Sequence, residues 1–171
     1  LCRAMLRNVK DRDAVQGAST LTMQLARNTF DMREKNLRRK LLEMAIARRI
    51  ERAYSKEEII HLYVNRIFFG TGLNGIEQAA RGYFGKAAAH LDLAESAMIA
   101  GIIRAPNRFS PFRNYDAALS EMRATIDRMV SEGLVGEKEA AIARSRTPQV
   151  LPQEAGLKIA AAGLVLAAAA A

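Results

Sequence analysis

The sequence predicts an all-α protein. Apolar residues recur at helical spacing along most of the chain, runs of β-branched residues are short, and no segment keeps the period-two alternation of a half-buried strand. The length of 171 residues suits about one domain with a single core. Hydrophobic residues make up 50% of the chain and charged residues 26%, which is typical of a globular protein and excludes wholesale disorder or a fibrous repeat.

Capping residues and apolar spacing predict the first two helices. Ser19 is a good N-cap for a helix that runs to about Asn28, and Asp31 can cap a longer helix that runs to about Arg52. The longer helix has one face that is crowded with arginine. Its apolar stripe consists of Leu37, Leu41, Met44 and Ala45.

A capping box predicts the start of the third helix. Ser55 and Glu58 have the spacing at which each side chain can accept a hydrogen bond from the other residue's backbone N–H. We expect Gly70 to end this helix. The residues predicted for its buried side are Ile59, Ile60, Tyr63, Val64 and Ile67.

Glycines and acidic residues divide the next part of the chain. Residues 70–75 are a glycine-rich loop, and a helix from about Ile76 ends near Gly85. Asp92 and Glu95 open another helix, which we expect to run to Ile103. Glu95 therefore has a structural explanation as the third residue of that helix.

The last part of the predicted domain is also helical. Pro106 and Pro111 impose irregular backbone, after which Asn114 or Asp116 starts a helix that ends near Gly133. A shorter helix over 137–144 follows. We place the domain over residues 1–146.

Residues 147–171 are predicted to be a linker and an alanine-rich apolar tail. Residues 159–171 are apolar throughout, but they are fewer than the roughly 20 that a membrane-spanning helix needs. The tail is the start of a longer hydrophobic segment, an interfacial helix or a disordered segment, and the last two together are favoured. No signal peptide is recognisable in residues 1–10.

Charge and cysteine content restrict the partners. The net charge of +8 favours an anionic partner such as a nucleic acid, a phosphorylated substrate or an acidic membrane surface. Cys2 has no second cysteine to pair with, and only His61 and His90 accompany it, so no structural zinc site is predicted.

One segment contains residues that are candidates for substrate binding or catalysis. Helical spacing places Arg39 and Lys40 on the same face as Glu43, four and three residues before it. Two cations beside one carboxylate can bind a diphosphate, while the carboxylate orients a cation or a proton. The same spacing also describes an ordinary solvated helix face with salt bridges, and spacing alone does not decide between them.

Several motifs in order resemble one enzyme family. Residues 17–28, which begin GASTLTMQ, are similar to the GxSTxTQQ signature of the peptidoglycan glycosyltransferases, glycosyltransferase family 51. Arg39, Lys40 and Glu43 match the family's next signature, and residues 56–65 resemble its KxxILxxYLN motif. Residues 81–86, 95–98 and 104–107 resemble later landmarks, so the likeness extends over about 17–129.

The resemblance implies a fold and an activity. Family members have a lysozyme-like α-helical domain that polymerises lipid II, a disaccharide-pentapeptide on a polyprenyl diphosphate, into glycan strands. Their general base belongs to an upstream EDxxFxxHxG motif, which is not present among these 171 residues. We therefore expect a domain that is incomplete at its N-terminus, a fragment with the phosphate-binding residues but without the principal base.

The resemblance also implies site residues and partners. Glu43 is carried over as the catalytic residue and as a ligand of a divalent cation, magnesium or manganese. The substrate-binding residues carried over are Thr20, Gln24, Arg27, Asn28, Arg39, Lys40 and Arg104. Met23 stands where the family often has glutamine, and we expect structural roles for Tyr63 and Asn65.

The implied partners follow from the family's substrate. They are lipid II, the nascent glycan strand and the membrane surface, with a transpeptidase domain as a further possibility in the parent chain. The implied location is the outer face of the cytoplasmic membrane.

Two other functions are compatible with part of the sequence. A basic helical nucleic-acid binder explains the charge, but it explains neither GASTLTMQ nor the YVN segment, and no aromatic stacking platform is evident, so we predict no nucleic-acid partner. A non-catalytic module that binds lipid diphosphates shares the phosphate-binding residues. This second alternative predicts that a lipid diphosphate binds to the protein but is not converted to product.

Overall fold

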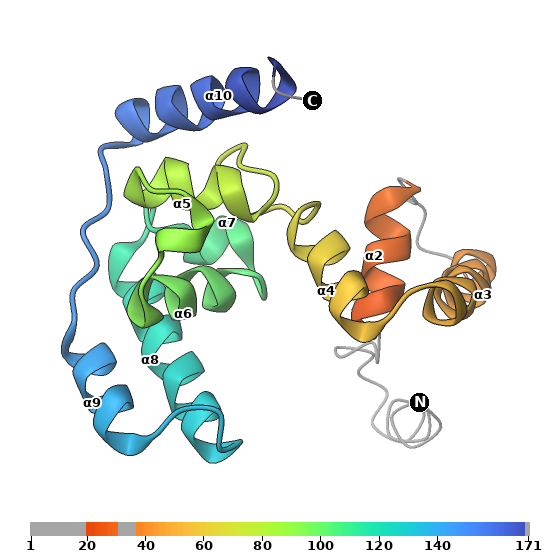
Figure 1. Ribbon diagram of the computed structural model, residues 1–171, viewed down its shortest axis with the longest axis horizontal. Helices are drawn as coiled ribbons and strands as arrows, with labels where there is room; N and C mark the ends of the chain where they lie inside the picture. The colour runs from red at the N-terminus through yellow and green to blue at the C-terminus, as the bar shows by residue number, and fades with distance from the viewer. Residues whose placement is uncertain (1–19, 31–36, 170–171) are drawn as a thin grey trace. The chain divides into compact units, whose positions relative to one another are not determined.

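The computed structural model describes residues 20–30 and 37–169, and helices dominate both ranges. The chain divides between Val64 and Asn65 into two compact units, each with its own internal packing. Figure 1 shows the helices of each unit, and no named β-strand occurs in the described residues. The all-α prediction is confirmed.

The first unit is built on α2 (Leu21–Thr29), α3 (Leu37–Ala53) and α4 (Lys56–Val64). Helix α2 packs against both α3 and α4. The N-cap of α2 is Thr20, whose Oγ1 accepts a hydrogen bond from the backbone N–H of Met23 at 3.2 Å. Ser19 and Asp31, the predicted caps of the first two helices, lie outside the described residues.

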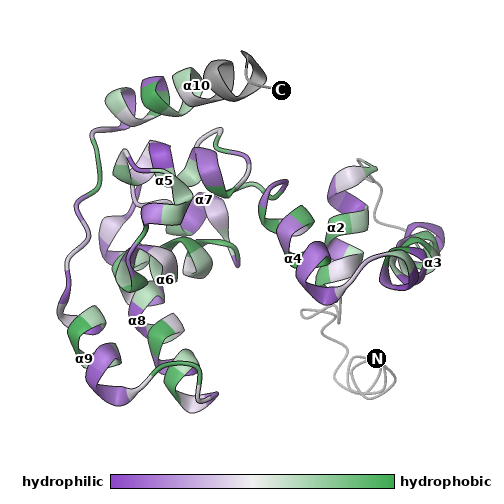
Figure 2. Ribbon diagram, viewed as in Figure 1, coloured by the Kyte–Doolittle hydropathy of each residue, from purple (hydrophilic) through white to green (hydrophobic). Residues whose placement is uncertain are grey.

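The apolar stripe predicted on α3 does not face a core in this unit. Leu37 is 72% exposed and Leu41 is 59% exposed, and only Glu43 and Ala47 of this helix are buried. Figure 2 shows hydrophilic and hydrophobic residues interspersed on α3. The helix turns a charged residue inward instead, because Glu43 has basic partners on its own helix.

Helix α4 begins as predicted and ends earlier. The backbone N–H of Ser55 donates to Glu58 Oε2 at 2.7 Å, and that of Glu58 donates to Ser55 Oγ at 3.2 Å, which is a capping box. Ile59 and Tyr63 are buried as predicted, but Ile60 is exposed. Ile67 is buried too, but it lies beyond the end of this helix and in the second unit. The helix stops at Val64 and not at Gly70, because the chain turns there toward the glycine-rich loop.

The second unit contains the remaining helices. Its main contacts join α6 to α8 and α5 to α10, with α9 against α8. The core between them holds large side chains such as Tyr83, Met98 and Ile126. The helices are α5 (Ile76–Phe84), the 3₁₀ helix η1 (Ala88–His90), α6 (Leu93–Ile102), α7 (Pro106–Phe109), α8 (Tyr115–Ser131), α9 (Glu137–Ser145) and α10 (Gln153–Ala169).

Most helix ends of the second unit follow the predicted signals. Gly85 ends α5 in a left-handed conformation, with φ of 69°. Asp92 and Glu95 form a complete capping box at the start of α6. Asn114, one of two predicted starts, caps α8 by accepting from the backbone N–H of Ala117 at 3.0 Å.

The glycine-rich loop 70–75 is tied to the core of this unit. Thr71 has a positive φ of 52°, which is uncommon for a residue with a Cβ. Its Oγ1 lies 2.9 Å from Ser110 Oγ, and Tyr83 donates its hydroxyl hydrogen to the carbonyl of Phe69 at 2.7 Å. These contacts hold the loop in one conformation.

The C-terminal segment runs along the second unit before it becomes helical. The backbone N–H of Leu151 donates to the carbonyl of Tyr83 at 2.9 Å, and the hydroxyl of Tyr115 donates to the carbonyl of Pro148 at 2.9 Å. Helix α10 then packs on α5 and buries Ala160. Within 20–30 and 37–169, no helix combines the length and apolar character needed to cross a membrane.

Candidate functional site

An ion-paired cluster on α3 is the centre of the candidate site. Arg39 Nε lies 3.2 Å from Glu43 Oε1, and Lys40 Nζ lies 3.4 Å from Glu43 Oε2. The carboxylate of Glu43 is 1% exposed, whereas the side chains of Arg39 and Lys40 are both partly exposed. Helix geometry brings the three together, since residues three and four apart share a face.

Burial gives this cluster a different character from a surface salt bridge. A buried carboxylate is stabilised only if it is paired, and here each oxygen faces a different cation. A guanidinium and an ammonium that share one carboxylate are groups that can bind an anion such as a diphosphate.

A second group joins α2 to α4. The hydroxyl of Tyr63 donates to Gln24 Oε1 at 3.1 Å, across a sequence separation of 39 residues. Burial raises the pKa of Tyr63 above its usual value of 10.0, and the nearby positive charge of Arg27 partly opposes this rise. Gln24, Arg27 and Tyr63 therefore lie together, and two of the three were predicted to bind substrate.

Other residues predicted on α2 have local structural roles or exposed positions. Thr20 Oγ1 is the cap of the helix, so its oxygen is already engaged with the backbone. Asn28 is exposed near the C-terminal end of α2. Met23 is 3% exposed and belongs to the core, which explains why an apolar side chain stands at a position where the family often has glutamine.

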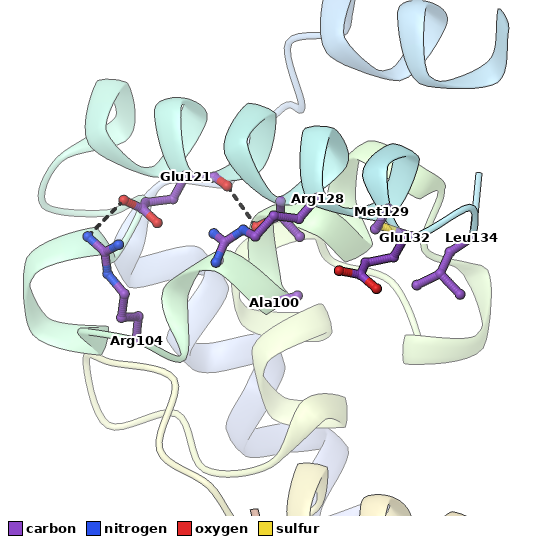
Figure 3. Close-up of a pocket in the computed structure, with 9 residues that line it drawn as sticks. Ala100, Arg104, Glu121, Arg128, Met129, Glu132 and Leu134 are labelled. Carbon is purple, nitrogen blue, oxygen red and sulfur yellow. Dashed lines mark hydrogen bonds and ion pairs between the residues drawn. The ribbon is translucent and has the colours of Figure 1, made fainter. Parts of the chain in front are cut away.

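Arg104 belongs to the second unit, whereas the residues described above belong to the first. It follows α6, its Nη2 lies 3.2 Å from Glu121 Oε1 on α8, and its guanidinium carbon lies 5.2 Å from the ring centre of Phe109. Figure 3 shows Arg104, Glu121 and Arg128 along a pocket of about 290 Å³ between α6 and α8. The structure thus gives Arg104 an ion pair and a cation–π contact within its own unit.

The residues around Glu43 do not fit a resident divalent cation. Magnesium in proteins is usually bound by one or two carboxylates together with waters and substrate phosphates. Glu43 already has two cationic partners, and in 20–30 and 37–169 no group of three or more histidine, cysteine or acidic residues could hold a metal.

Sequence reasoning did not assign Tyr63 to the site. It was predicted to be structural because it is an apolar-face residue of the third helix, and its 4% exposure agrees with that prediction. Its hydroxyl nevertheless reaches Gln24, one of the carried-over residues. One feature of the sequence could have indicated this contact. A tyrosine that is predicted to be buried needs a hydrogen-bond partner for its hydroxyl.

Comparison with known proteins identifies the family. A family model described as Transglycosylase matches residues 1–130. The chain belongs to the transglycosylase family. Penicillin-binding protein 1A of Aquifex aeolicus is 41% identical over 135 residues, and penicillin-binding protein 1A of Escherichia coli is 43% identical over 126 residues. A protein of Cupriavidus necator that is named as a transglycosylase is 43% identical over 137 residues.

The transglycosylase match spans most of this chain and a smaller part of each relative. The alignments cover 79%, 74% and 80% of this chain, but 19%, 15% and 59% of the Aquifex, Escherichia and Cupriavidus proteins. The crystal structure of penicillin-binding protein 1A from Haemophilus influenzae matches 75% of this chain and 17% of that chain, with a TM-score of 0.51 and 23% identity. That likeness shows the fold, which is the predicted lysozyme-like helical class.

Proposed function

We propose that the chain acts in peptidoglycan synthesis as a glycosyltransferase that polymerises lipid II. The observation that carries the proposal is the buried Glu43 with Arg39 and Lys40 on its two oxygens, in a chain of the transglycosylase family. A diphosphate leaving group needs charge stabilisation, and preorganised cations supply it. The net charge of +8 also favours an anionic lipid substrate.

The proposed reaction is an inverting displacement. A general base takes the proton from the 4-hydroxyl of the acceptor sugar, and that oxygen forms a bond to the anomeric carbon of the growing strand. The bond from the anomeric carbon to the phosphate oxygen breaks, and polyprenyl diphosphate leaves with the electron pair. In the family the base belongs to the EDxxFxxHxG motif, which these residues do not include.

Arg39 and Lys40 are proposed to bind the diphosphate directly. Arg39 can form two parallel hydrogen bonds to phosphate oxygens, whereas Lys40 acts as a point charge. The burial of Glu43 suits a positioning role, in which it holds the two cations and does not contact the sugar. Gln24, Arg27 and Asn28 of α2 are proposed as further contacts to the substrate. Thr20 and Arg104 are proposed as substrate contacts on the family resemblance alone.

The proposed partners are the nascent glycan strand and the membrane that carries the lipid. The proposed location is the outer face of the cytoplasmic membrane, where lipid II is polymerised. A transpeptidase domain in the parent chain is proposed from the relatives named penicillin-binding protein 1A. A divalent cation, magnesium or manganese, is proposed to enter with the substrate diphosphate and not as a resident of the protein.

Polymerisation of labelled lipid II tests the proposal. The assay compares this chain with a chimaera that adds the upstream residues of the Aquifex aeolicus relative, each with a Glu43→Gln variant. We expect glycan polymer from the chimaera, and its reduction by at least about tenfold in the variant, because Arg39 and Lys40 lose their shared anion.

Binding of the same lipid separates the remaining alternatives. If lipid II binds but neither protein makes polymer, the non-catalytic lipid-diphosphate module is favoured. If a DNA duplex binds with strong salt dependence and lipid II does not bind, the glycosyltransferase proposal is wrong.

A further inference from the structure

Gln24 and Tyr63 form a hydrogen bond whose direction has a chemical consequence. Tyr63 is the donor and the carbonyl oxygen Oε1 of Gln24 is the acceptor, at 3.1 Å. The oxygen and nitrogen of a primary amide point in different directions from the trigonal amide carbon. With Oε1 turned to Tyr63, the NH₂ group of Gln24 is turned away from it.

This direction matters for a glutamine that contacts substrate. A glutamine amide has one accepting end and one donating end, and free rotation would present either of them. Phosphate and sugar oxygens are acceptors, so only the NH₂ end can donate to them. The partial exposure of Gln24 leaves this side chain accessible, while Tyr63 is held in the core.

We infer that Tyr63 is a positioning residue that fixes the amide of Gln24 with its donating end presented to an oxygen of the lipid diphosphate substrate. The inference deepens the proposed function and rests on it. Tyr63 acts through Gln24 and does not itself touch the substrate. Its ring projects from α4 and is buried in the first unit, which defines where the hydroxyl lies.

The surroundings of the hydroxyl support a persistent donor. The usual tyrosine pKa of 10.0 already lies above neutrality, and burial raises the pKa of Tyr63 further. The hydroxyl therefore keeps its hydrogen through the neutral range. The positive charge of Arg27 opposes that rise only in part. Arg27 is one turn beyond Gln24 on α2, so the donating amide and the guanidinium lie on neighbouring positions of one helix face.

The test measures binding of fluorescent lipid II in detergent micelles to the 171-residue chain. Tyr63→Phe removes the hydroxyl and keeps the ring, and we expect binding to weaken by roughly 2- to 10-fold, the range for one lost hydrogen bond. Tyr83→Phe is the matched control, because it removes a buried hydroxyl that donates to the carbonyl of Phe69 in the other unit. We expect lipid II to bind the control as tightly as it binds the parent.

A double-mutant cycle excludes a merely structural effect. In a Gln24→Ala background, Tyr63→Phe should cause no further loss of affinity, because the group that it positions is gone. Equal losses in both backgrounds, or unchanged affinity of Tyr63→Phe in the parent, would overturn the inference while leaving the proposed function intact. If the unsubstituted 171-residue chain does not bind lipid II, the proposed function is wrong. The inference that Gln24 contacts this substrate is then wrong as well.

A measurement without ligand checks the orientation directly. The side-chain amide signals of Gln24 in a ¹⁵N NMR spectrum are assigned by their loss in Gln24→Ala. We expect Tyr63→Phe to shift these signals and to increase their fast mobility, and Tyr83→Phe to leave both unchanged. Signals that are identical in all three proteins would show that the hydroxyl does not hold the amide.

Discussion

Gly156 of α10 lies against the backbone carbonyl of Gly82 in α5, so close that a Cβ on Gly156 would overlap that oxygen. Gly163 of the same helix lies against the side chain of Arg81, and the buried Ala160 stands between the two glycines on this face. The contact between α5 and α10 thus depends on small residues, and the tail is part of the packing of the second unit.

Gly156→Ala should therefore destabilise the protein. Replacing glycine by alanine inside a helix improves helix propensity by about 1 kcal/mol. Overpacking typically costs about 1–3 kcal/mol, and it costs more where the contacting atom is backbone that cannot move. We expect a lower free energy of unfolding in urea and faster hydrogen exchange of the Leu151 amide. Gly136→Ala is the control, because no atom stands within 4 Å of a Cβ at that position. Equal stability of Gly156→Ala and its parent would contradict the packing described here.

The capping box of α6 gives a second prediction. Asp92 Oδ1 accepts from the backbone N–H of Glu95 at 2.9 Å, and its Oδ2 pairs with Arg146. Asp92→Ala removes both contacts and should lower the free energy of unfolding by about 1–2 kcal/mol. Urea denaturation measures the change, with Ser96→Ala on the exposed face of α6 as the control. A loss no larger than that of the control would mean that the cap contributes nothing.

Helix limits could be predicted where the signal is local. Capping side chains and left-handed glycines act within a few residues, so the starts of α4, α6 and α8 and the end of α5 follow from sequence. The buried side of α3 could not be predicted in this way. Its leucines are exposed and Glu43 is buried, because which face turns inward depends on the contacts of neighbouring helices and on ion pairing.

The candidate site was predictable in part. Helical spacing alone places Arg39 and Lys40 beside Glu43, and the structure confirms both ion pairs. The burial of that carboxylate is a tertiary property with no local signal. The contact between Gln24 and Tyr63 joins residues 39 positions apart, so only the packing of α2 on α4 reveals it.

Metal binding by the chain alone gives a third prediction. Glu43 faces two cations, and a divalent ion at this carboxylate would meet repulsion from both. We expect manganese to bind the protein without substrate only weakly, with a Kd of about 1 mM or more. Electron paramagnetic resonance of free manganese measures this value for the parent and for Glu43→Gln. Micromolar binding that is lost in Glu43→Gln would restore Glu43 as a metal ligand.

Alkaline pH gives the last prediction, through the buried Tyr83. Burial raises its pKa above the usual 10.0, although hydrogen bonds with Ser110 and Thr71 and the charge of Arg113 oppose part of the rise. Below about pH 10, Tyr83 is protonated in both the folded and the unfolded protein, and its full contribution to stability is present. Above that pH the unfolded chain releases the proton first, so the free energy of unfolding falls as pH rises.

Tyr83→Phe isolates this effect. At about pH 8 the variant should be less stable than its parent by roughly 1–3 kcal/mol, because the hydroxyl no longer donates to the carbonyl of Phe69. At about pH 11 the difference should be smaller, since only the parent loses stability through Tyr83. Urea denaturation at both pH values measures the two differences, with the exposed Tyr54→Phe as a control. A difference that stays constant or widens with pH would mean that the folded protein does not hold the proton of Tyr83 more tightly than the unfolded chain does.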